Sequence, residues 1–342
     1  MIEQAIERVI VLGPVAFAAF FLSLALIVLL RPSLARYAMA RPNARSSHHS
    51  PTPQGGGIAV VVATLGAVWT AVALMPMLQN QRGSFLIVTA AAVLLALVGA
   101  FDDLWSLPAI SRFPLQCVAV GAAIATLPNE LQILPQVPWW IERAGLFVGG
   151  LWFVNLVNFM DGLDWMTVAE VVPATGTIVV LGLCGVIDPL PALVAAALLG
   201  AILGFAPFNK PVARLFLGDV GSLPIGLLLG WLLLELAARG QLAGALILPL
   251  YYLADGTITL MRRVVRREPV WRPHRTHFYQ RATDNGFTVP EIIARVFLVN
   301  LVLAALAVLT VAPVGTAVSL VALAAGLAAV TALLVTFARR RR

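Results

Sequence analysis

Eleven long apolar runs constrain the fold of this 342-residue chain more than any other feature of its sequence. Each run is bounded by charged residues, proline or glycine, and most approach the roughly 20 residues that an α-helix needs to cross a bilayer. Because 60% of the residues are hydrophobic and only 11% are charged, an ordinary soluble domain and a disordered chain are excluded. We predict an all-α polytopic membrane protein with about eleven transmembrane helices, or ten if one of the short fourth and fifth runs does not cross. The predicted spans are residues 9–30, 55–78, 84–101, 113–127, 144–159, 166–187, 191–207, 221–238, 241–261, 291–312 and 315–337.

The distribution of arginine predicts the orientation of these spans. Of 23 basic residues, 22 are arginine, and 18 of the 23 fall in alternate loops and the C-terminus, against four in the other loops. Since cytoplasmic loops carry an excess of Lys and Arg, we expect a periplasmic N-terminus and a cytoplasmic C-terminus. The net charge of +7 then reflects membrane topology, and we expect no nucleic-acid partner. The expected cytoplasmic loops are residues 31–54, 102–112, 160–165, 208–220 and 262–290.

The chain shows no internal repeat and no separate soluble segment, so residues 1–342 are expected to form one integral-membrane domain. The first run is preceded by Glu3, Glu7 and Arg8 and is followed by no small-residue cleavage site. This pattern favours a retained membrane anchor over a cleaved signal peptide. Cys117 and Cys184 lie inside apolar runs without a metal-ligand spacing, and they imply neither a disulfide framework nor a zinc site.

Aspartates gather on the expected cytoplasmic side, where seven of the eight lie. Charged groups at membrane depth are costly, so a cluster of them favours a functional site. Asp102 and Asp103 follow each other at the end of the third run. Adjacent carboxylates repel each other unless a proton, a divalent cation such as Mg²⁺ or an arginine such as Arg112 offsets the charge. The simpler alternative for each aspartate is that it faces water or caps the next helix.

Two further motifs place acidic and amide side chains at helix ends. In NLVNFMDGLD at 155–164 the polar residues recur three apart, which puts them on one helix face if the helix continues, although Gly162 indicates a turn. Packing between helices accounts for Asn155 alone but poorly for four polar residues in a row. In FLGDVGS at 216–222, Asp219 is either the N-cap of the following helix, with Ser222 at its third position, or a ligand for a hard cation.

The two long loops add basic and glycine-rich segments. HRTHFYQR at 274–281 combines arginines, whose forks match phosphate oxygens, with two histidines, for which a metal site is the weaker interpretation. The arginines at 262–267 are explained by contact with anionic headgroups. The three glycines at 55–57 let a ligand or another backbone approach closely. Carboxylates for a cation, basic groups for phosphates and a glycine entry on one face indicate phosphoryl transfer between a soluble phosphate ester and a lipid.

These motifs resemble those of the polyprenyl-phosphate N-acetylhexosamine-1-phosphate transferases, the superfamily of the bacterial MraY, WecA and WbpL enzymes. FDD at 101–103 and the three motifs above occur in the family's order on successive expected cytoplasmic loops, and together they cover nearly the whole chain. The resemblance implies ten or eleven spans in the bacterial inner (cell) membrane. It also implies transfer of a sugar 1-phosphate from a UDP-sugar to undecaprenyl phosphate with release of UMP, dependent on Mg²⁺ or alternatively Mn²⁺, as the first membrane step of O-antigen or cell-envelope polysaccharide synthesis.

The resemblance also implies roles for individual residues. Asp219 and Asn158 would bind Mg²⁺, and Asp102 and Asp103 would orient or deprotonate the lipid phosphate, whose oxygen attacks the β-phosphorus of the nucleotide. Phe216 matches the position that stacks on uracil. The other implied substrate-binding residues are Arg45, His49, Asn155, Asp161, Asp164, Asn209, His274, Arg275, His277 and Arg281. We favour direct attack over a covalent aspartyl intermediate, because direct attack requires only positioning, a cation and a base.

Two differences between this sequence and the peptidoglycan enzymes of the family affect which sugar we expect in the UDP-sugar donor. The loop reads His-Arg-Thr-His where those enzymes carry three successive histidines, and this is closer to the WbpL branch. No lysine precedes the glycine segment, because Lys210 is the only lysine, so His49 or Arg45 would take its place. We therefore expect GlcNAc or a deoxy-N-acetylhexosamine such as FucNAc or QuiNAc, with a phospho-MurNAc-pentapeptide transferase and an ion-coupled transporter as alternatives. The expected partners are undecaprenyl phosphate, a UDP-N-acetylhexosamine and the lipid bilayer, and a homodimer is allowed.

Overall fold

The computed structural model describes residues 2–40, 51–127, 132–269, 274–311 and 315–341. The prediction of an all-α protein is confirmed: within these ranges the only strands are the two-residue β1 (Met39–Ala40) and β2 (Thr52–Pro53), which pair antiparallel. The helices are α1 (Ile2–Tyr37), α2 (Gly57–Leu74), the 3-10 helix η1 (Pro76–Gln81), α3 (Arg82–Trp105), α4 (Ala109–Ala125), α5 (Trp139–Met160), α6 (Met166–Leu183), α7 (Pro189–Asn209), α8 (Asp219–Ala238), α9 (Leu242–Ile247), α10 (Leu250–Val265), α11 (Phe278–Asp284), α12 (Val289–Leu309) and α13 (Thr316–Ala338).

The structure supports nine or ten of the predicted crossings. Nine helices in the described ranges are long and apolar enough to cross a membrane, and α4 adds a shorter apolar helix over Ile110–Ala125. The predicted run 241–261 is not one helix, because it divides into α9 and α10 around Leu248 and Pro249. Proline has no backbone N–H and clashes with the preceding turn, so a helix is readily interrupted there. The fifth run is longer than predicted, because α5 begins at Trp139 and has 22 residues.

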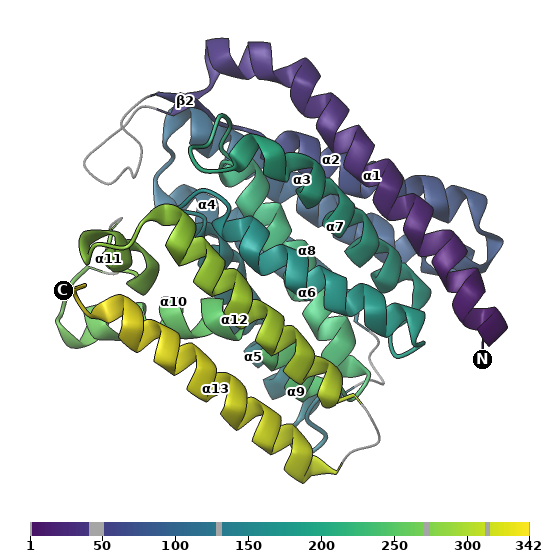
Figure 1. The fold of residues 1–342 in the computed structure, drawn as a ribbon. Coiled ribbons are helices and arrows are strands. Elements are labelled where there is room, and N and C mark those ends of the chain that lie inside the picture. The colour runs from purple at the N-terminus through teal and green to yellow at the C-terminus, as the bar shows by residue number, and fades with distance from the viewer. Residues whose placement is uncertain (1, 41–50, 128–131, 270–273, 312–314, 342) are drawn as a thin grey trace.

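The centre of the helix bundle is formed by α7 and α8. In each of them 83% of the apolar window is buried, against 22% in α1. Helix α7 packs against α1, α2 and α6, and α8 packs against α3 and α5. Figure 1 shows α1 and α13 along opposite flanks of the bundle. Because a helix that is apolar on all sides must be surrounded by protein or lipid, α7 and α8 form the interior and the outer helices face the membrane.

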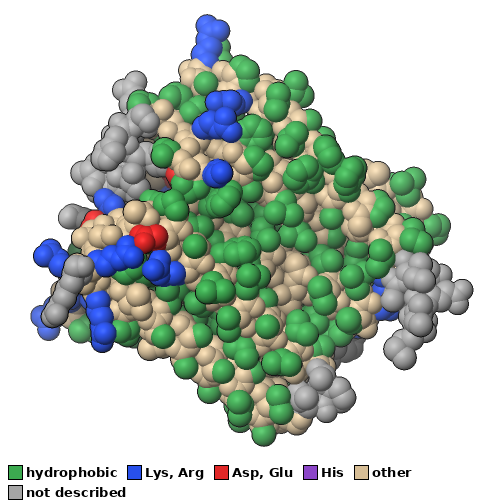
Figure 2. Space-filling view, in the orientation of Figure 1, with side chains coloured by type: hydrophobic (Ala, Val, Ile, Leu, Met, Phe, Trp, Pro, Cys, Tyr) green, Lys and Arg blue, Asp and Glu red, His purple; other side chains and the backbone are tan. Residues whose placement is uncertain are grey.

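The surface of the bundle is divided between an apolar belt and a basic end. On the face drawn in Figure 2, hydrophobic side chains cover most of the surface, while Lys and Arg gather mainly at the end that carries α11 and the C-terminus. Exposed large apolar residues include Phe17, Leu29, Leu298 and Val321. So wide an apolar surface requires lipid around it, and the chain is a multi-pass membrane protein. The end that carries β2, α11 and the C-terminus, opposite the N-terminus in Figure 1, is called the polar end below.

Candidate active site

Close contact between helix backbones brings the acidic motifs together. Gly99 of α3 lies against Asp219, and a Cβ at residue 99 would overlap the Asp219 carbonyl group. Gly57 of α2 lies in the same way against Gly221 of α8. Small residues permit membrane helices to approach this closely. Asp102, one turn beyond Gly99, therefore lies beside the first turn of α8.

Asp103 is bound to the N-terminus of α8. Its Oδ1 accepts a hydrogen bond from the N–H of Asp219 at 3.0 Å, and its Oδ2 accepts one from the N–H of Val220 at 3.1 Å. A carboxylate in this position satisfies N–H groups that have no partner within the helix and interacts favourably with the helix dipole. The alternative in which Asp219 is itself the N-cap is wrong, because Gly218 with φ +78° precedes the helix and Asp103 reaches across from α3.

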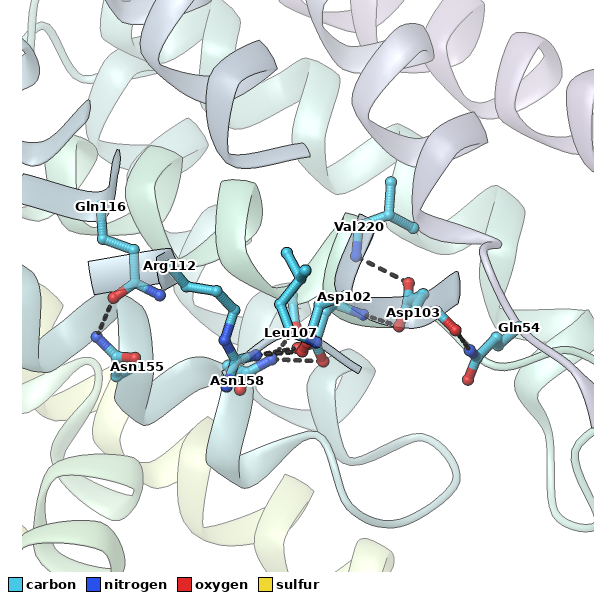
Figure 3. Close-up of polar contacts among 11 residues, drawn as sticks. Gln54, Asp102, Asp103, Leu107, Arg112, Gln116, Asn155, Asn158 and Val220 are labelled. Atoms are coloured by element: carbon cyan, nitrogen blue, oxygen red, sulfur yellow. Dashed lines mark hydrogen bonds and ion pairs between the residues drawn. The ribbon is translucent and has the colours of Figure 1, made fainter. Parts of the chain in front are cut away.

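Arg112 joins the two remaining carboxylates of this cluster. Its Nη1 contacts Oδ2 of Asp102 and lies 3.1 Å from Oδ2 of Asp219. The other oxygen of Asp102 accepts a hydrogen bond from the N–H of Leu107 at 2.6 Å. The hypothesis that Arg112 offsets the paired aspartates is confirmed (Figure 3). Among the described residues, Arg112 is the only one that forms an ion pair with this cluster, so one positive charge faces three carboxylates.

Asn158 completes the cluster from the end of α5. Its Nδ2 donates to Oδ1 of Asp219 and to Oγ of Ser222, both at 2.8 Å. Helix α5 ends at Met160, so the turn that Gly162 indicated is confirmed, and Asp161 and Asp164 do not continue the helix face of Asn158. The backbone leaves the helix just before Gly162, where a Cβ would overlap the hydroxyl of Tyr279.

The donor set of this acidic cluster fits a magnesium ion. Asp102 and Asp219 supply two carboxylates that a single arginine holds together, and Asn158 supplies an amide group beside them. Mg²⁺ usually binds one or two carboxylates and completes its coordination with water and substrate phosphates. The described part of the chain contains no group of three or more His, Cys, Asp or Glu arranged to enclose a metal. Such a set suits a cation that is shared with a phosphate substrate better than a closed structural site.

The glycine segment lies against the acidic cluster, as the sequence indicated. Gln54 donates through Nε2 to the carbonyl oxygen of Asp103 at 2.8 Å. The N–H groups of Gly56 and Gly57 donate to the carbonyl oxygens of Phe216 and Leu217 at 2.9 and 2.8 Å. These contacts fix the backbone of the FLGDVGS motif next to α2. The role of Gln54 was not predicted, and its position directly before the glycines was the only signal in the sequence.

Asn209 and Asp164 organise the segment between α7 and α8. Oδ1 of Asn209 accepts from the N–H of Trp165 at 2.7 Å, and its Nδ2 donates to the carbonyl oxygen of Leu215 at 3.0 Å. Oδ2 of Asp164 accepts from the N–H of Ala213 at 2.9 Å. Both side chains are buried and hold the backbone that leads to Phe216. Their observed contacts are therefore with the protein backbone.

The basic motif joins the acidic cluster through Tyr279. The Tyr279 hydroxyl donates to the carbonyl oxygen of Phe159 at 3.0 Å, next to Asn158. His277 stacks between His274 and Tyr279, with ring centroids 5.0 and 5.7 Å apart. Burial is the main cause that lowers the pKa of His274 to about 4, with smaller electrostatic contributions from its neighbours His277 and Arg263. The aromatic contacts place the motif at the end of α5, and sequence reasoning had assigned no role to Tyr279.

The other predicted residues lie at varied distances from the acidic cluster. Asn155 donates to Oε1 of Gln116 at 2.9 Å and so serves the packing of α4 on α5. Arg275 folds over α11, where its Nη2 donates to Oγ1 of Thr283 at 2.9 Å. Arg281 lies near Arg262, whose pKa it helps to lower after the larger effect of burial. Arg45 and His49 fall outside the described residues.

Asp161 lies between the acidic cluster and the basic motif. The pKa of its carboxyl group is raised to about 7, mainly by burial, with a hydrogen bond from Thr167 that opposes the rise and the charges of Asp103 and Asp164 that add to it. An aspartate with this pKa changes charge close to physiological pH. Asp161 therefore couples the charge of the site to pH.

An apolar cavity of about 510 Å³ adjoins α5 on the side away from the polar end. Its lining includes Val120, Ile124, Phe153, Trp231, Leu246 and Leu253, from five different helices. The lining reaches Val154, one turn of α5 before Asn158. A polar site and an apolar cavity thus follow each other along one helix, and this arrangement suits a ligand with a charged head and a hydrocarbon tail.

Comparison with known proteins finds one family match and several relatives of this chain. Residues 85–237 match glycosyl transferase family 4, a range that contains the FDD, NLVNFMDGLD and FLGDVGS motifs. A probable undecaprenyl-phosphate N-acetylglucosaminyl 1-phosphate transferase of Bacillus subtilis (strain 168) is 24% identical over 322 residues, covering 89% of this chain and 85% of that protein. A decaprenyl-phosphate N-acetylglucosaminephosphotransferase of Mycobacterium tuberculosis (strain CDC 1551 / Oshkosh) is 28% identical over 308 residues, covering 76% and 72%. The corresponding protein of Mycolicibacterium smegmatis (strain ATCC 700084 / mc(2)155) is 32% identical over 219 residues, covering 56% and 52%.

Proposed function

Since the chain belongs to glycosyl transferase family 4, we propose that it transfers N-acetylglucosamine 1-phosphate, or the 1-phosphate of a deoxy-N-acetylhexosamine, from a UDP-sugar to undecaprenyl phosphate. An oxygen of the lipid phosphate attacks the β-phosphorus, and the bond between the β-phosphorus and the bridging oxygen breaks. UMP leaves with the electron pair, and undecaprenyl-diphosphate-sugar is the product. The observation that carries this proposal is the acidic cluster of Asp102, Asp103 and Asp219 at one end of α5, with the apolar cavity further along the same helix.

We place the reaction at the cytoplasmic face, where a nucleotide sugar is available. This proposal rests on the arginine distribution, which assigns the polar end to the cytoplasm and the N-terminus to the periplasm. The whole chain would act as one membrane domain, with the undecaprenyl tail in or beside the apolar cavity.

Within the acidic cluster, Asp219, Asn158 and Asp102 would hold Mg²⁺, with Mn²⁺ as an alternative. The cation would neutralise the diphosphate and the charge that develops on the leaving UMP. Asp103 engages both of its carboxylate oxygens at the N-terminus of α8, so we assign it the positioning of Asp219. Asp102, whose Oδ2 pairs with the side chain of Arg112 and not with the backbone of α8, is then the better candidate to orient or deprotonate the lipid phosphate.

The nucleotide would lie on the side of the 210–218 segment. Phe216 would stack on uracil, with Asn209 and Asp164 shaping the backbone around it. The basic motif residues His274, Arg275, His277 and Arg281 would lie near the diphosphate and the sugar, and Arg45 and His49 would contribute from the loop before the glycines. Arginines suit this role because their charge-assisted hydrogen bonds match phosphate oxygens.

The relatives support GlcNAc over the MurNAc-pentapeptide alternative, since the three relatives above carry N-acetylglucosamine in their names. The test is a donor screen in which purified protein is mixed with undecaprenyl phosphate, Mg²⁺ and one UDP-sugar at a time, and UMP is measured. We expect UMP from UDP-GlcNAc or from a UDP-deoxy-N-acetylhexosamine, and none when Mg²⁺ is chelated. No UMP from any donor would refute the proposal.

Direct attack by the lipid phosphate makes a separate prediction. A covalent aspartyl intermediate forms without the lipid and would exchange labelled UMP into UDP-GlcNAc. Direct attack cannot do so. We therefore expect no exchange of labelled UMP in the absence of undecaprenyl phosphate, and rapid exchange would establish the covalent route instead.

A further inference from the structure

Asp255 of α10 is a completely buried carboxylate at the polar end of the bundle, with no role in the site described so far. Five hydrogen-bond donors surround its two oxygens. Oδ1 lies 3.2 Å from Nδ1 of His277, 3.0 Å from the N–H of Phe278 and 3.3 Å from Oγ1 of Thr259. Oδ2 lies 3.1 Å from the N–H of Tyr279 and 3.3 Å from the hydroxyl of Tyr251. A buried charge is tolerated only when donors satisfy it in this way.

Three of these five donors belong to the basic motif. Asp255 accepts the first two N–H groups of the short helix α11 and so fixes where that helix begins. The other two donors, Tyr251 and Thr259, lie one turn before and one turn after Asp255 on the same face of α10. The carboxylate is therefore held by its own helix on one side and holds the basic motif on the other.

The contact with Asp255 also orients the ring of His277. Nδ1 of His277 lies 3.2 Å from Oδ1 of Asp255, which turns the other ring nitrogen, Nε2, away from the carboxylate. The ring is clamped between His274 and Tyr279, and the hydroxyl of Tyr279 is bonded to the end of α5 beside Asn158. A chain of contacts thus connects Asp255 to the acidic cluster.

We propose that Asp255 is a positioning residue for the sugar-1-phosphate transfer: it fixes α11 and the ring of His277 so that the basic motif is ready to bind the diphosphate of the UDP-sugar. This inference rests on the proposed function. Asp255 itself contacts protein groups only, among the described residues, so its effect on the donor passes through His277 and α11.

The test is Asp255→Asn. An amide has one acceptor oxygen, so its NH₂ group would face either the N–H of Tyr279 or the donors at Oδ1, and two donors repel. We expect the KM for the UDP-sugar to rise about tenfold, equivalent to about 1.4 kcal/mol of lost donor binding, while the KM for undecaprenyl phosphate changes less than twofold. A purely structural loss would lower the active fraction, and hence kcat, with both KM values unchanged.

Glu170→Gln is the matched control. Glu170 of α6 is also buried, and its Oε2 accepts a hydrogen bond at 2.7 Å from Nδ2 of Asn300, a residue of α12 and not of α11. The same carboxylate-to-amide change there should leave both KM values within twofold of wild type. If Asp255→Asn does not fold, Tyr251→Phe removes one donor from the carboxylate without changing the basic motif, and it should raise the donor KM about fivefold, beyond the range allowed to the control.

Hydrogen exchange provides a second measurement that does not depend on turnover. In Asp255→Asn the amides of Phe278 and Tyr279 should exchange faster than in wild type, while those of α6 are unchanged. Wild-type exchange at these amides, or a wild-type donor KM in an active variant, would overturn the positioning role. If the wild-type protein itself releases no UMP, the proposed function is refuted. That result differs from a wild-type donor KM in an active variant, which refutes only the positioning role of Asp255.

Discussion

Asp219 and Asp255 are both aspartates at the polar end of the bundle, yet their surroundings are opposite. Asp219 shares its space with Asp102 and Asp103, and the one described cation in ion pairs with this cluster, Arg112, pairs with Asp102 and Asp219. Asp255 faces no second carboxylate among its hydrogen-bond partners and accepts from five donors. The first site retains negative charge that a cation or a phosphate-bound metal can use, whereas the second is already satisfied. A carboxylate that lies beside other carboxylates, with too little positive charge to balance them, indicates a catalytic or metal-binding role. A carboxylate whose oxygens are fully hydrogen-bonded indicates a positioning role.

The largest effect is expected at Asp219. Asp219→Asn removes a charge that the cation needs, so we predict a fall in kcat of about 1,000-fold in the UMP assay. The melting temperature should stay the same or rise, because repulsion with Asp102 and Asp103 is relieved. Asp255→Asn should instead lower the melting temperature, since it breaks satisfied buried bonds. Equal activity losses and equal melting shifts in both variants would remove the distinction between the two aspartates.

The next effect concerns the helix contact that creates the acidic cluster. A Cβ at residue 99 overlaps the backbone of Asp219, so Gly99→Ala should push α3 from α8 and cost about 1–3 kcal/mol of stability. A displacement of about 1 Å at the reacting groups would lower kcat about 100-fold. Gly176→Ala is the control, because nothing lies within 4 Å of a Cβ built there. It should leave kcat unchanged, and a Gly99→Ala variant with wild-type kcat would contradict the argument from close approach.

The smallest effect is a pH dependence through Asp161, which lies between the two regions. Because its pKa is raised to about 7, Asp161 is protonated below that pH and charged above it. If the enzyme binds its substrates when Asp161 is charged, kcat/KM should rise severalfold from pH 6 to pH 8. His274, with a pKa lowered to about 4, is neutral throughout that range and cannot cause the rise. Asp161→Asn should remove this rise of kcat/KM between pH 6 and pH 8. If the rise is unchanged in the variant, another group causes it.

The fold could be predicted to the extent that it depends on apolar run length. Ten of the eleven runs each form one main helix, but the run 241–261 divides at Pro249, and the apolar run length by which it was identified is insensitive to a proline. The start of α5 was misjudged because Glu142 and Arg143 interrupt the apolar pattern, while helix geometry tolerates them near an end. Hydropathy measures the cost of burial in lipid, and it is insensitive to such local features of the backbone.

The residues of the site could be predicted from the sequence where their type is enough to identify them. They could not be predicted where their role depends on a contact that forms only in the folded chain. The motif pattern identified Asp102, Asp103, Asn158 and Asp219, which the structure brings together. The same pattern could not show that Asp103 caps α8 or that His277 is buried against Asp255, because each contact joins residues more than 20 positions apart. In the sequence Asp255 is a single acid within the apolar run 241–261, and only the folded chain supplies its five donors.

The central claim is that the β-phosphorus of a UDP-sugar moves to a lipid phosphate at the acidic cluster. The most direct measurement uses UDP-GlcNAc, or the donor found in the screen, with ³²P in the β position, undecaprenyl phosphate and Mg²⁺, followed by extraction of the lipid. The account predicts that the label enters the lipid fraction with wild-type protein and not with Asp219→Asn, and that the nucleotide product is unlabelled UMP. Labelled UDP as the product, with an unlabelled lipid, would show transfer of the sugar without its phosphate and would contradict the account.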